Sequence, residues 1–237
     1  MVSPIILHSG DSLFSNITTV DESLAMISVC SIYGYELLIL GAPYFATRKT
    51  SQVIDFVKYI SSKTNLAIMY YNSPQFGVIL DETELEIIVD IENIVGVKEA
   101  SFNPEISIKS HVNLGEKAII STPDEWIFWE GKKSGFQQTV MFANTSDWRF
   151  DTPENNSYTT FVQNACNGNI DDNLYISEIK EIKSISDEWW GKIVSDAGGV
   201  LPVALCKYWG EIVGMSGEYC GDEVLVAHVP EDDDGTA

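Results

Sequence analysis

Short apolar segments, rich in residues that favour strands, recur along the first two-thirds of the chain. They are PIILHSG from Pro4, ELLILGAP from Glu36, LAIMYYN from Leu66, IVGVKEA from Ile94, KAIIST from Lys117 and QTVMFAN from Gln138. Most intervals between them hold a segment with helical periodicity, such as residues 50–64 and 81–93. Strands that are apolar throughout and alternate with helices indicate a parallel sheet covered by helices. We therefore predict six successive βα units.

After residue 160 the pattern becomes helical. The helical segments are FVQNACNG from Phe161, NLYISEIKEIKSI from Asn173, DEWWGKIV from Asp187 and PVALCKYWGEIVG from Pro202. We predict a C-terminal helical region over residues 161–228, followed by a solvated acidic tail over residues 229–237.

Two architectures can hold the six units. A doubly wound open sheet usually carries a glycine-rich phosphate turn after its first strand, and HSGDSLFS is not such a turn. A (β/α)₈ barrel needs eight strands, whereas the pattern shows six. The hydrophobic pattern by itself leaves this choice open.

The composition is typical of a folded protein outside the membrane. Of the 237 residues 45% are hydrophobic, which excludes a disordered chain, and no apolar run reaches the ~18 residues of a membrane-spanning helix. The first residues lack the basic segment of a secretory signal, so we expect a cytoplasmic protein. The net charge of −21 argues against nucleic acid and anionic membranes as partners. Four widely spaced cysteines and three histidines give no metal-ligand spacing.

One predicted strand carries a lysine near its carboxyl end, where the functional groups of a barrel lie. Lys98 falls within the apolar strand NIVGVKEAS and shares a face with Gly96 and Ala100, whose small size is expected to leave space around the amine. A buried ammonium must be paired or release its proton, and a neutral amine can form a Schiff base with a carbonyl. The alternative is a lysine paired with Glu99 or another carboxylate.

The preceding strand ends in a tyrosine, Tyr71, within YYNSP. Its phenol could reach the same end of the sheet and move protons while a Schiff base forms. The alternative is an amphipathic core residue whose hydroxyl is satisfied at the rim.

Residues 65–101, which read NLAIMYYNSPQFGVILDETELEIIVDIENIVGVKEAS, resemble the central segment of the dihydrodipicolinate synthase/N-acetylneuraminate lyase family. In that family a strand ending in Tyr-Asn-x-Pro is followed by a helix and by a strand with the Schiff-base lysine. Residues 37–60 resemble the family's strand ending in Pro-Tyr-Tyr and its next helix, and residues 198–219 resemble its C-terminal helices.

The resemblance implies a (β/α)₈ TIM barrel, with about six of its eight units in residues 1–160, plus C-terminal helices. It implies a lyase or aldolase that forms a Schiff base with pyruvate or another 2-keto acid, needs no cofactor or metal, and assembles as a dimer or tetramer. Lys98 would condense with the keto group, Tyr71 would shuttle protons, and Tyr44 would line the site. We expect Phe76 and Asn144, which follow predicted strand ends, to bind substrate.

Two departures from the family pattern argue against an authentic dihydrodipicolinate synthase. Phe45 replaces the second tyrosine of Pro-Tyr-Tyr, whose hydroxyl completes a proton relay across the dimer interface in those enzymes. The segment YYNSPQFG lacks their arginine for the carboxylate of the second substrate, and Gln75 and Phe76 occupy the region. An aromatic side chain there suggests a less charged second substrate or leaving aldehyde, and favours a paralogous lyase or aldolase.

A third departure concerns the start of the sequence. PIILHSGDS aligns with the third barrel strand of the family, so strands one and two, with the turn that holds the substrate carboxylate, are expected to be missing. An alternative function is therefore an inactive truncated paralogue or fragment that binds a keto acid or a partner without turnover. A phosphate-binding barrel isomerase is a third possibility, but the strand ends offer no glycine-rich phosphate cradle.

Overall fold

The structure is a computed structural model that describes residues 6–8, 20–44, 46–123, 127, 130–131, 134–135, 151, 154–167, 169 and 172–196. The chain divides into two compact units. The first comprises residues 1–142 and 165–168, and the second comprises residues 143–164 and 169–237. The predicted boundary at residue 160 stays a prediction.

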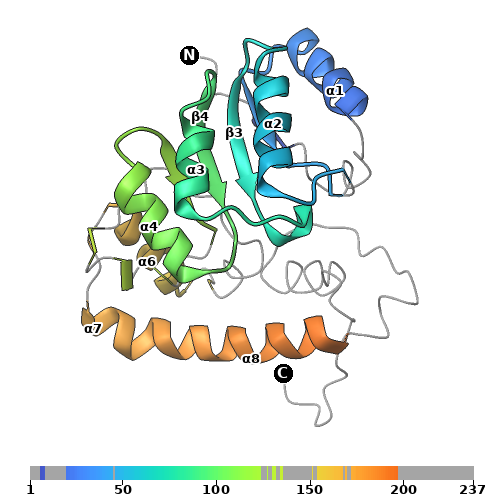
Figure 1. Ribbon diagram of the computed structural model, residues 1–237. Helices are drawn as coiled ribbons and strands as arrows, with labels where there is room; N and C mark the ends of the chain where they lie inside the picture. Colours follow the sequence, from blue (N-terminus) through green and yellow to red (C-terminus); the bar gives the residue numbers. More distant parts are fainter. Residues whose placement is uncertain are drawn as a thin grey trace. The chain divides into compact units, whose positions relative to one another are not determined.

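Five parallel strands form one sheet in the first unit (Figure 1). They are β1 (Ile6–His8), β2 (Leu37–Leu40), β3 (Ala67–Asn72), β4 (Ile94–Glu99) and β5 (Ile119–Ser121). Their order in the sheet is their order in the sequence. A doubly wound sheet reverses its strand order at a switch point, whereas a barrel wall adds each strand beside the last. The sheet is therefore part of a barrel wall. The sixth predicted strand, from Gln138, lies outside the described residues.

Helices connect these strands and cover one face of the sheet. They are α1 (Val20–Ile32), α2 (Thr50–Ser61), α3 (Glu82–Val89) and α4 (Pro104–Leu114). Figure 1 shows α2 and α3 side by side in front of β3 and β4. The helices predicted over residues 50–64 and 81–93 are thus confirmed, each ending a few residues earlier than its pattern.

Strand and helix side chains meet in one buried cluster. The strands contribute Leu38, Leu40, Ile68, Tyr70, Val97 and Ile120, and α2 and α3 contribute Val53, Phe56, Val57, Ile60, Leu85 and Ile88. Successive side chains of a strand point to opposite faces. The strand residues between these positions, such as Ile39, Met69 and Lys98, therefore point away from the helices, toward the interior side of the barrel wall.

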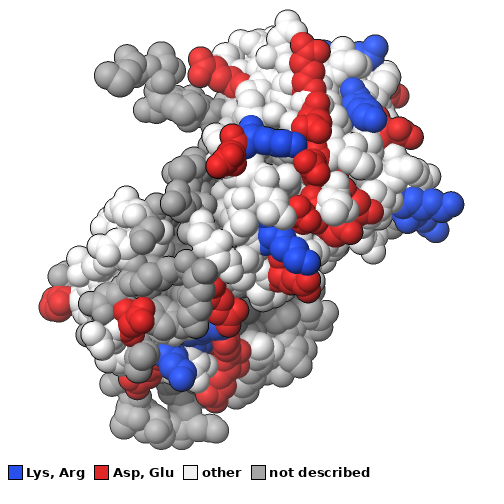
Figure 2. Space-filling model, turned by 60° about the vertical axis from the view of Figure 1, so that its left-hand side comes forward, with Lys and Arg blue, Asp and Glu red and all other residues white. Residues whose placement is uncertain are grey.

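Exposed ion pairs lie on the outer side of α3 and α4. Lys109 Nζ lies 2.7 Å from Glu105 Oε1, and Lys117 Nζ lies 2.8 Å from Glu86 Oε1. Figure 2 shows a band of acidic side chains with basic ones beside it. Because water screens exposed pairs, they contribute little to stability, and the buried cluster is the main stabilising feature of this unit.

Most described residues of the second unit are helical. The helices α7 (Asp172–Leu174), η4 (Tyr175–Ile179, a π-helical turn) and α8 (Lys180–Asp196) follow one another without a break. The two helical segments predicted from Asn173 and Asp187 therefore form one continuous run. Helix α6 (Ser157–Cys166) covers the start of the segment from Phe161, and the segment from Pro202 lies outside the described residues. Among the described helices, none combines the length and apolar character that a membrane crossing requires.

A capping box closes the first turn of α3 and gives a testable contribution to stability. Asp81 Oδ1 accepts a hydrogen bond from the Glu84 N–H at 2.9 Å, and Glu84 Oε2 accepts one from the Asp81 N–H at 2.9 Å. We expect Asp81→Ala to lower the free energy of unfolding by about 1 kcal/mol, because the Glu84 N–H loses its acceptor. Urea denaturation at neutral pH measures this loss, and equal stability of variant and wild type would contradict it.

The contribution of this cap to the stability of the fold depends on pH. The hydrogen bond from the Glu84 N–H, followed by that from Thr83, holds the pKa of Asp81 below its usual value. A carboxyl whose pKa is lowered by folding stabilises the fold fully above about pH 4 and loses this effect as the pH falls through the lowered pKa. Asp81→Asn is the control, because asparagine caps the helix but does not titrate. Its stability should lack the part that Asp81 loses in acid.

Candidate active site

Tyr71 and Lys98 face each other from neighbouring strands. Strand β3 pairs with β4 so that Tyr71 lies opposite Lys98, and Lys98 Nζ lies 4.0 Å from the centroid of the Tyr71 ring. Their preceding residues, Tyr70 and Val97, belong to the helix-facing cluster, so Tyr71 and Lys98 point to the inner side of the wall. The structure thus brings together the two residues that the sequence singled out for chemistry.

Glu99, the carboxylate beside Lys98 in sequence, points to the other face of β4. Its Oε1 accepts a hydrogen bond from the Ser101 N–H at 2.9 Å, and its Oε2 is hydrogen-bonded to Ser107 Oγ on α4. Adjacent strand residues point apart. The geometry therefore does not favour the Lys98–Glu99 pair that the sequence left open.

Gly96 shares the inner face with Lys98, but its surroundings are filled. A Cβ atom on Gly96 would lie 2.3 Å from the carbonyl oxygen of Ile119 and 2.8 Å from Met69 Cε. The glycine therefore allows β4 and β5 to approach closely. At Gly96 itself no space is left, because these neighbouring atoms fill it.

Phe76 covers the same end of the sheet from the loop after β3. It ends the short helix η1 (Pro74–Phe76) and meets the Tyr71 ring edge-on, with centroids 5.2 Å apart and an interplanar angle of 70°. A Cβ atom on Gly41, just after β2, would lie 2.3 Å from the Phe76 ring. Phe76 therefore packs on the β2 end and on Tyr71 at once.

Tyr44 reaches the same loop one residue further along. Its ring lies 3.2 Å from the position of a Cβ atom on Gly77, whose φ of +84° favours glycine. Half of the Tyr44 side chain is exposed, and it lines a cavity of about 350 Å³ together with Arg48 and Val78. Arg48 is a cation on the same cavity as Tyr44 that sequence reasoning did not single out.

Asn72, directly after Tyr71, has both ends of its amide engaged. Its Oδ1 accepts a hydrogen bond from the Leu80 N–H at 2.9 Å, and its Nδ2 donates to the Leu80 carbonyl at 2.9 Å and to Glu99 Oε1 at 3.3 Å. Asn72 and Glu99 were also missed by sequence reasoning. The sequence did contain a signal for them, because Asn72 directly follows Tyr71 and Glu99 directly follows Lys98, each within an otherwise apolar strand.

The expected substrate-binding residue Asn144 lies outside the described residues, as does Phe45, which replaces the second tyrosine of Pro-Tyr-Tyr. Within the described ranges, no group of three or more His, Cys, Asp or Glu side chains is placed to hold a metal ion.

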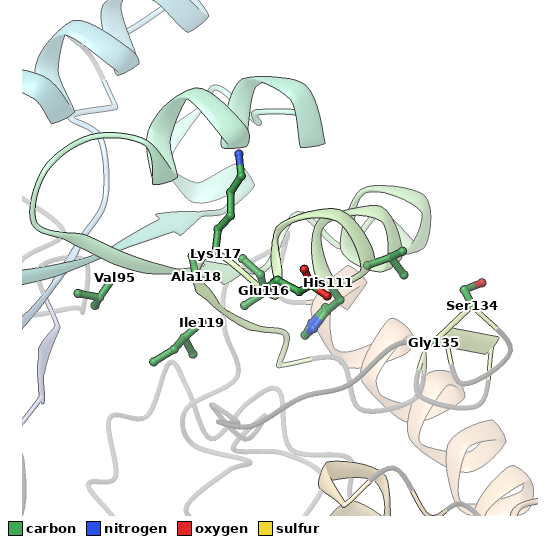
Figure 3. Close-up of a pocket in the computed structure, with 11 residues that line it drawn as sticks. Val95, His111, Glu116, Lys117, Ala118, Ile119, Ser134 and Gly135 are labelled. Carbon is green, nitrogen blue, oxygen red and sulfur yellow. The ribbon is translucent and has the colours of Figure 1, made fainter.

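A larger cavity lies at the opposite end of the strands (Figure 3). It has a volume of about 620 Å³ and is lined by the end of α4, the start of β5 and residues 134–135. Lys117 points away from it toward α3, and His111 Nε2 lies 3.2 Å from Thr122 Oγ1. Because barrel enzymes carry their chemistry at the carboxyl ends of the strands, the site around Lys98 is the better candidate.

Known sequences that resemble this chain include a family profile and several enzymes that share one name. The profile of the dihydrodipicolinate synthetase family matches residues 14–172. The 4-hydroxy-tetrahydrodipicolinate synthase of Thermotoga petrophila is 30% identical over 131 residues, which cover 54% of this chain and 40% of that protein. The Bacillus subtilis enzyme of the same name is 28% identical over 130 residues, with the same coverage. The match thus spans less than half the length of these relatives.

Comparison with solved structures identifies the fold. A monomeric dihydrodipicolinate synthase variant superposes with a TM-score of 0.64 at 16% identity, covering 95% of this chain and 71% of that one. The Thermotoga maritima dihydrodipicolinate synthase gives 0.60 at 17% identity, covering 85% and 63%. N-acetylneuraminate lyase from Mycoplasma synoviae gives 0.52 at 13% identity, covering 95% and 71%. The barrel wall inferred from the strand order is therefore of the type found in these enzymes.

Proposed function

The chain belongs to the dihydrodipicolinate synthetase family, and on this premise we propose that it is a Schiff-base-forming lyase or aldolase for pyruvate or a related 2-keto acid. The observation that carries the proposal is the Lys98–Tyr71 pair, with the amine 4.0 Å from the ring centroid on the inner face of the wall. We also propose a homo-oligomeric cytoplasmic enzyme that needs no metal or organic cofactor.

The proposed reaction uses the amine and the phenol in turn. The neutral amine of Lys98 adds to the keto carbon, and the resulting carbinolamine loses water with a proton supplied by Tyr71. The C4 hydroxyl of the bound 2-keto-4-hydroxy acid then gives its proton to the Tyr71 phenolate, the bond between C3 and C4 breaks with its electron pair moving toward the iminium to form an enamine, and the aldehyde leaves. Protonation of the enamine at C3 and hydrolysis of the imine release pyruvate and the free amine. In the reverse direction, loss of a proton gives an enamine that attacks an aldehyde.

The position of Lys98 over the Tyr71 ring suits the resting state. An ammonium is attracted to the face of an aromatic ring, so the pair holds the amine beside the phenol before substrate binds. The amine then has to release its proton and leave the ring face to reach a carbonyl.

Trapping with borohydride tests the proposal. The folded protein, checked by circular dichroism, is incubated with pyruvate and borohydride, and intact mass spectrometry detects the reduced adduct. We expect one adduct per chain, located on Lys98 by peptide mapping. A folded protein that gives no adduct would overturn the proposal. An adduct without cleavage of any 2-keto-4-hydroxy acid would instead identify keto-acid binding without turnover.

The position of Phe76 favours a second substrate, or a leaving aldehyde, whose end is uncharged or apolar. Within the loop of residues 73–80 there is no arginine, and the Phe76 ring packs against Tyr71. We therefore expect the protein to cleave 2-keto-4-hydroxy acids with an apolar substituent in preference to those with a carboxylate.

The size of this preference can be measured through Phe76. Phe76→Arg should shift the ratio of kcat/KM values by roughly tenfold or more toward the carboxylate substrate, while Phe76→Leu keeps the apolar preference. Pyruvate trapping serves as the control, since it should change little in either variant. An unchanged ratio in Phe76→Arg would exclude Phe76 as a specificity residue.

A further inference from the structure

A second pair of side chains lies directly behind the reactive pair. In the register of β3 and β4, Tyr71 lies opposite Lys98 and Asn72 lies opposite Glu99. Because strand side chains alternate, Asn72 and Glu99 point to the helix side of the sheet. Both are fully buried. Burial of polar groups is costly unless they are hydrogen-bonded, so the contacts of this pair indicate what it does.

The orientation of the Asn72 amide follows from its neighbours. The Leu80 N–H can only donate, so the oxygen of the amide must face it, at 2.9 Å. The Nδ2 group is then left to donate to the Leu80 carbonyl at 2.9 Å and to Glu99 Oε1 at 3.3 Å. Asn72 therefore closes the loop that carries Phe76 and connects it to β4.

Glu99 joins three elements of the fold. Its Oε1 accepts from Asn72 Nδ2 on β3 and from the N–H of Ser101 in the turn after β4. Its Oε2 is hydrogen-bonded to Ser107 Oγ on α4. Burial raises the pKa of Glu99, and the hydrogen bonds from Ser101, Ser107 and Asn72 oppose that shift. A single carboxyl group thus fixes the end of β4, immediately after Lys98, against β3 and α4.

We infer that the hydrogen-bonded Asn72–Glu99 pair is a positioning element that holds Lys98 and Tyr71 in register for Schiff-base formation, acting from the outer face of the sheet. This inference rests on the proposed function. Neither side chain points to the inner face, so the pair acts through the backbone of the residues it follows. Misplacement of reacting groups by about 1 Å can cost 10²-fold in rate. Loss of the pair should therefore slow the reaction without weakening binding of the keto acid.

Two serines on α4 provide a matched test that does not remove a buried carboxyl. Ser107 and Ser110 are both buried, but Ser107 Oγ bonds Glu99 whereas Ser110 Oγ has no hydrogen-bond partner among the described residues. We expect Ser107→Ala to lower the borohydride-trapping rate at saturating pyruvate about threefold to tenfold, the range of one lost hydrogen bond. Ser110→Ala should trap at the wild-type rate.

Two substitutions of Glu99 itself complete the test. The alanine variant should slow trapping more than Ser107→Ala does, and the conservative glutamine variant should keep the rate. Glu99→Gln keeps the three partners, since its oxygen accepts from Asn72 and Ser101 and its amide donates to Ser107 Oγ, which reverses the direction of the Ser107 hydrogen bond, so trapping should stay near wild type. Glu99→Ala should lower the trapping rate per folded molecule about 10-fold to 100-fold. The pyruvate concentration for half-maximal trapping should not change.

The outcomes separate this inference from the proposed function. If the folded wild-type protein gives no adduct, the proposed function fails and this inference fails with it. If the wild type is trapped and both Ser107→Ala and Glu99→Ala match its rate per folded molecule, the pair is merely structural and only this inference is overturned. A loss confined to pyruvate affinity in these variants would overturn it as well, whether or not Glu99→Ala folds poorly.

Discussion

Replacement of Lys98 by alanine is expected to abolish the borohydride-trapped adduct with pyruvate. No other described lysine lies at the carboxyl end of a strand on the inner face of the sheet. Loss of a covalent nucleophile costs more than about 10³-fold in rate, so intact mass should show unmodified protein. Cleavage of 2-keto-4-hydroxy acids should be lost to the same extent.

Two further lysine variants make this result specific. Lys98→Arg keeps a cation for the face of the Tyr71 ring but offers no nucleophilic amine, so it too should give no adduct. Lys63 lies over the Tyr59 ring at 5.1 Å in an exposed part of the helix layer, and Lys63→Ala should be trapped like the wild type. An adduct that persists in Lys98→Ala would assign the chemistry to another amine and remove the basis of the proposed function.

The strands and helices of the first unit were predicted well from the sequence because their signals are local, whereas the barrel was expected only from the family resemblance. An apolar run such as LAIMYYN favours a strand. Asp81 and Glu84, three residues apart, form a capping box that marks the start of a helix. The strand-end rule for barrels then placed Tyr71 and Lys98 at the same end of the sheet. These inferences need only the neighbours of each residue along the chain.

The register between β3 and β4 could not be predicted in this way. Ile68 pairs with Ile94, but Met69 pairs with Gly96, so one extra residue, Val95, is accommodated as a bulge. Without the bulge, Tyr71 would lie opposite Val97. A shift of one residue decides which side chains face each other, and nothing in the local sequence specifies it.

The contacts of Gly96, Asn72 and Glu99 escaped prediction for a similar reason. Each depends on a partner from another element: the β5 backbone for Gly96, Leu80 for Asn72 and Ser107 for Glu99. Sequence reasoning expected the small Gly96 to leave space around the amine, and it left a Lys98–Glu99 pair open as an alternative. Only the packing of β4 against β5 and α4 shows that these positions hold the sheet together.

Replacement of Tyr71 by phenylalanine is the second large expected effect. The variant keeps an aromatic ring beneath Lys98 Nζ and against Phe76, so packing and the resting position of the amine should be retained. Only the hydroxyl is lost. Since proton transfer by a positioned side chain contributes about 10²-fold to 10⁴-fold, the trapping rate at saturating pyruvate should fall by that factor, with stability to urea unchanged.

Tyr70, the neighbour on the same strand, supplies the matched control. It is fully buried in the helix-facing cluster, burial raises its pKa, and its hydroxyl has no hydrogen-bond partner among the described residues. Tyr70→Phe removes an unsatisfied buried hydroxyl, so the fold should be as stable or more stable and trapping should be unchanged. If Tyr71→Phe is also trapped at the wild-type rate, the phenol is not the proton donor. Lys98 would then form its imine with protons from water, and Tyr71 would act only as the ring that holds the amine.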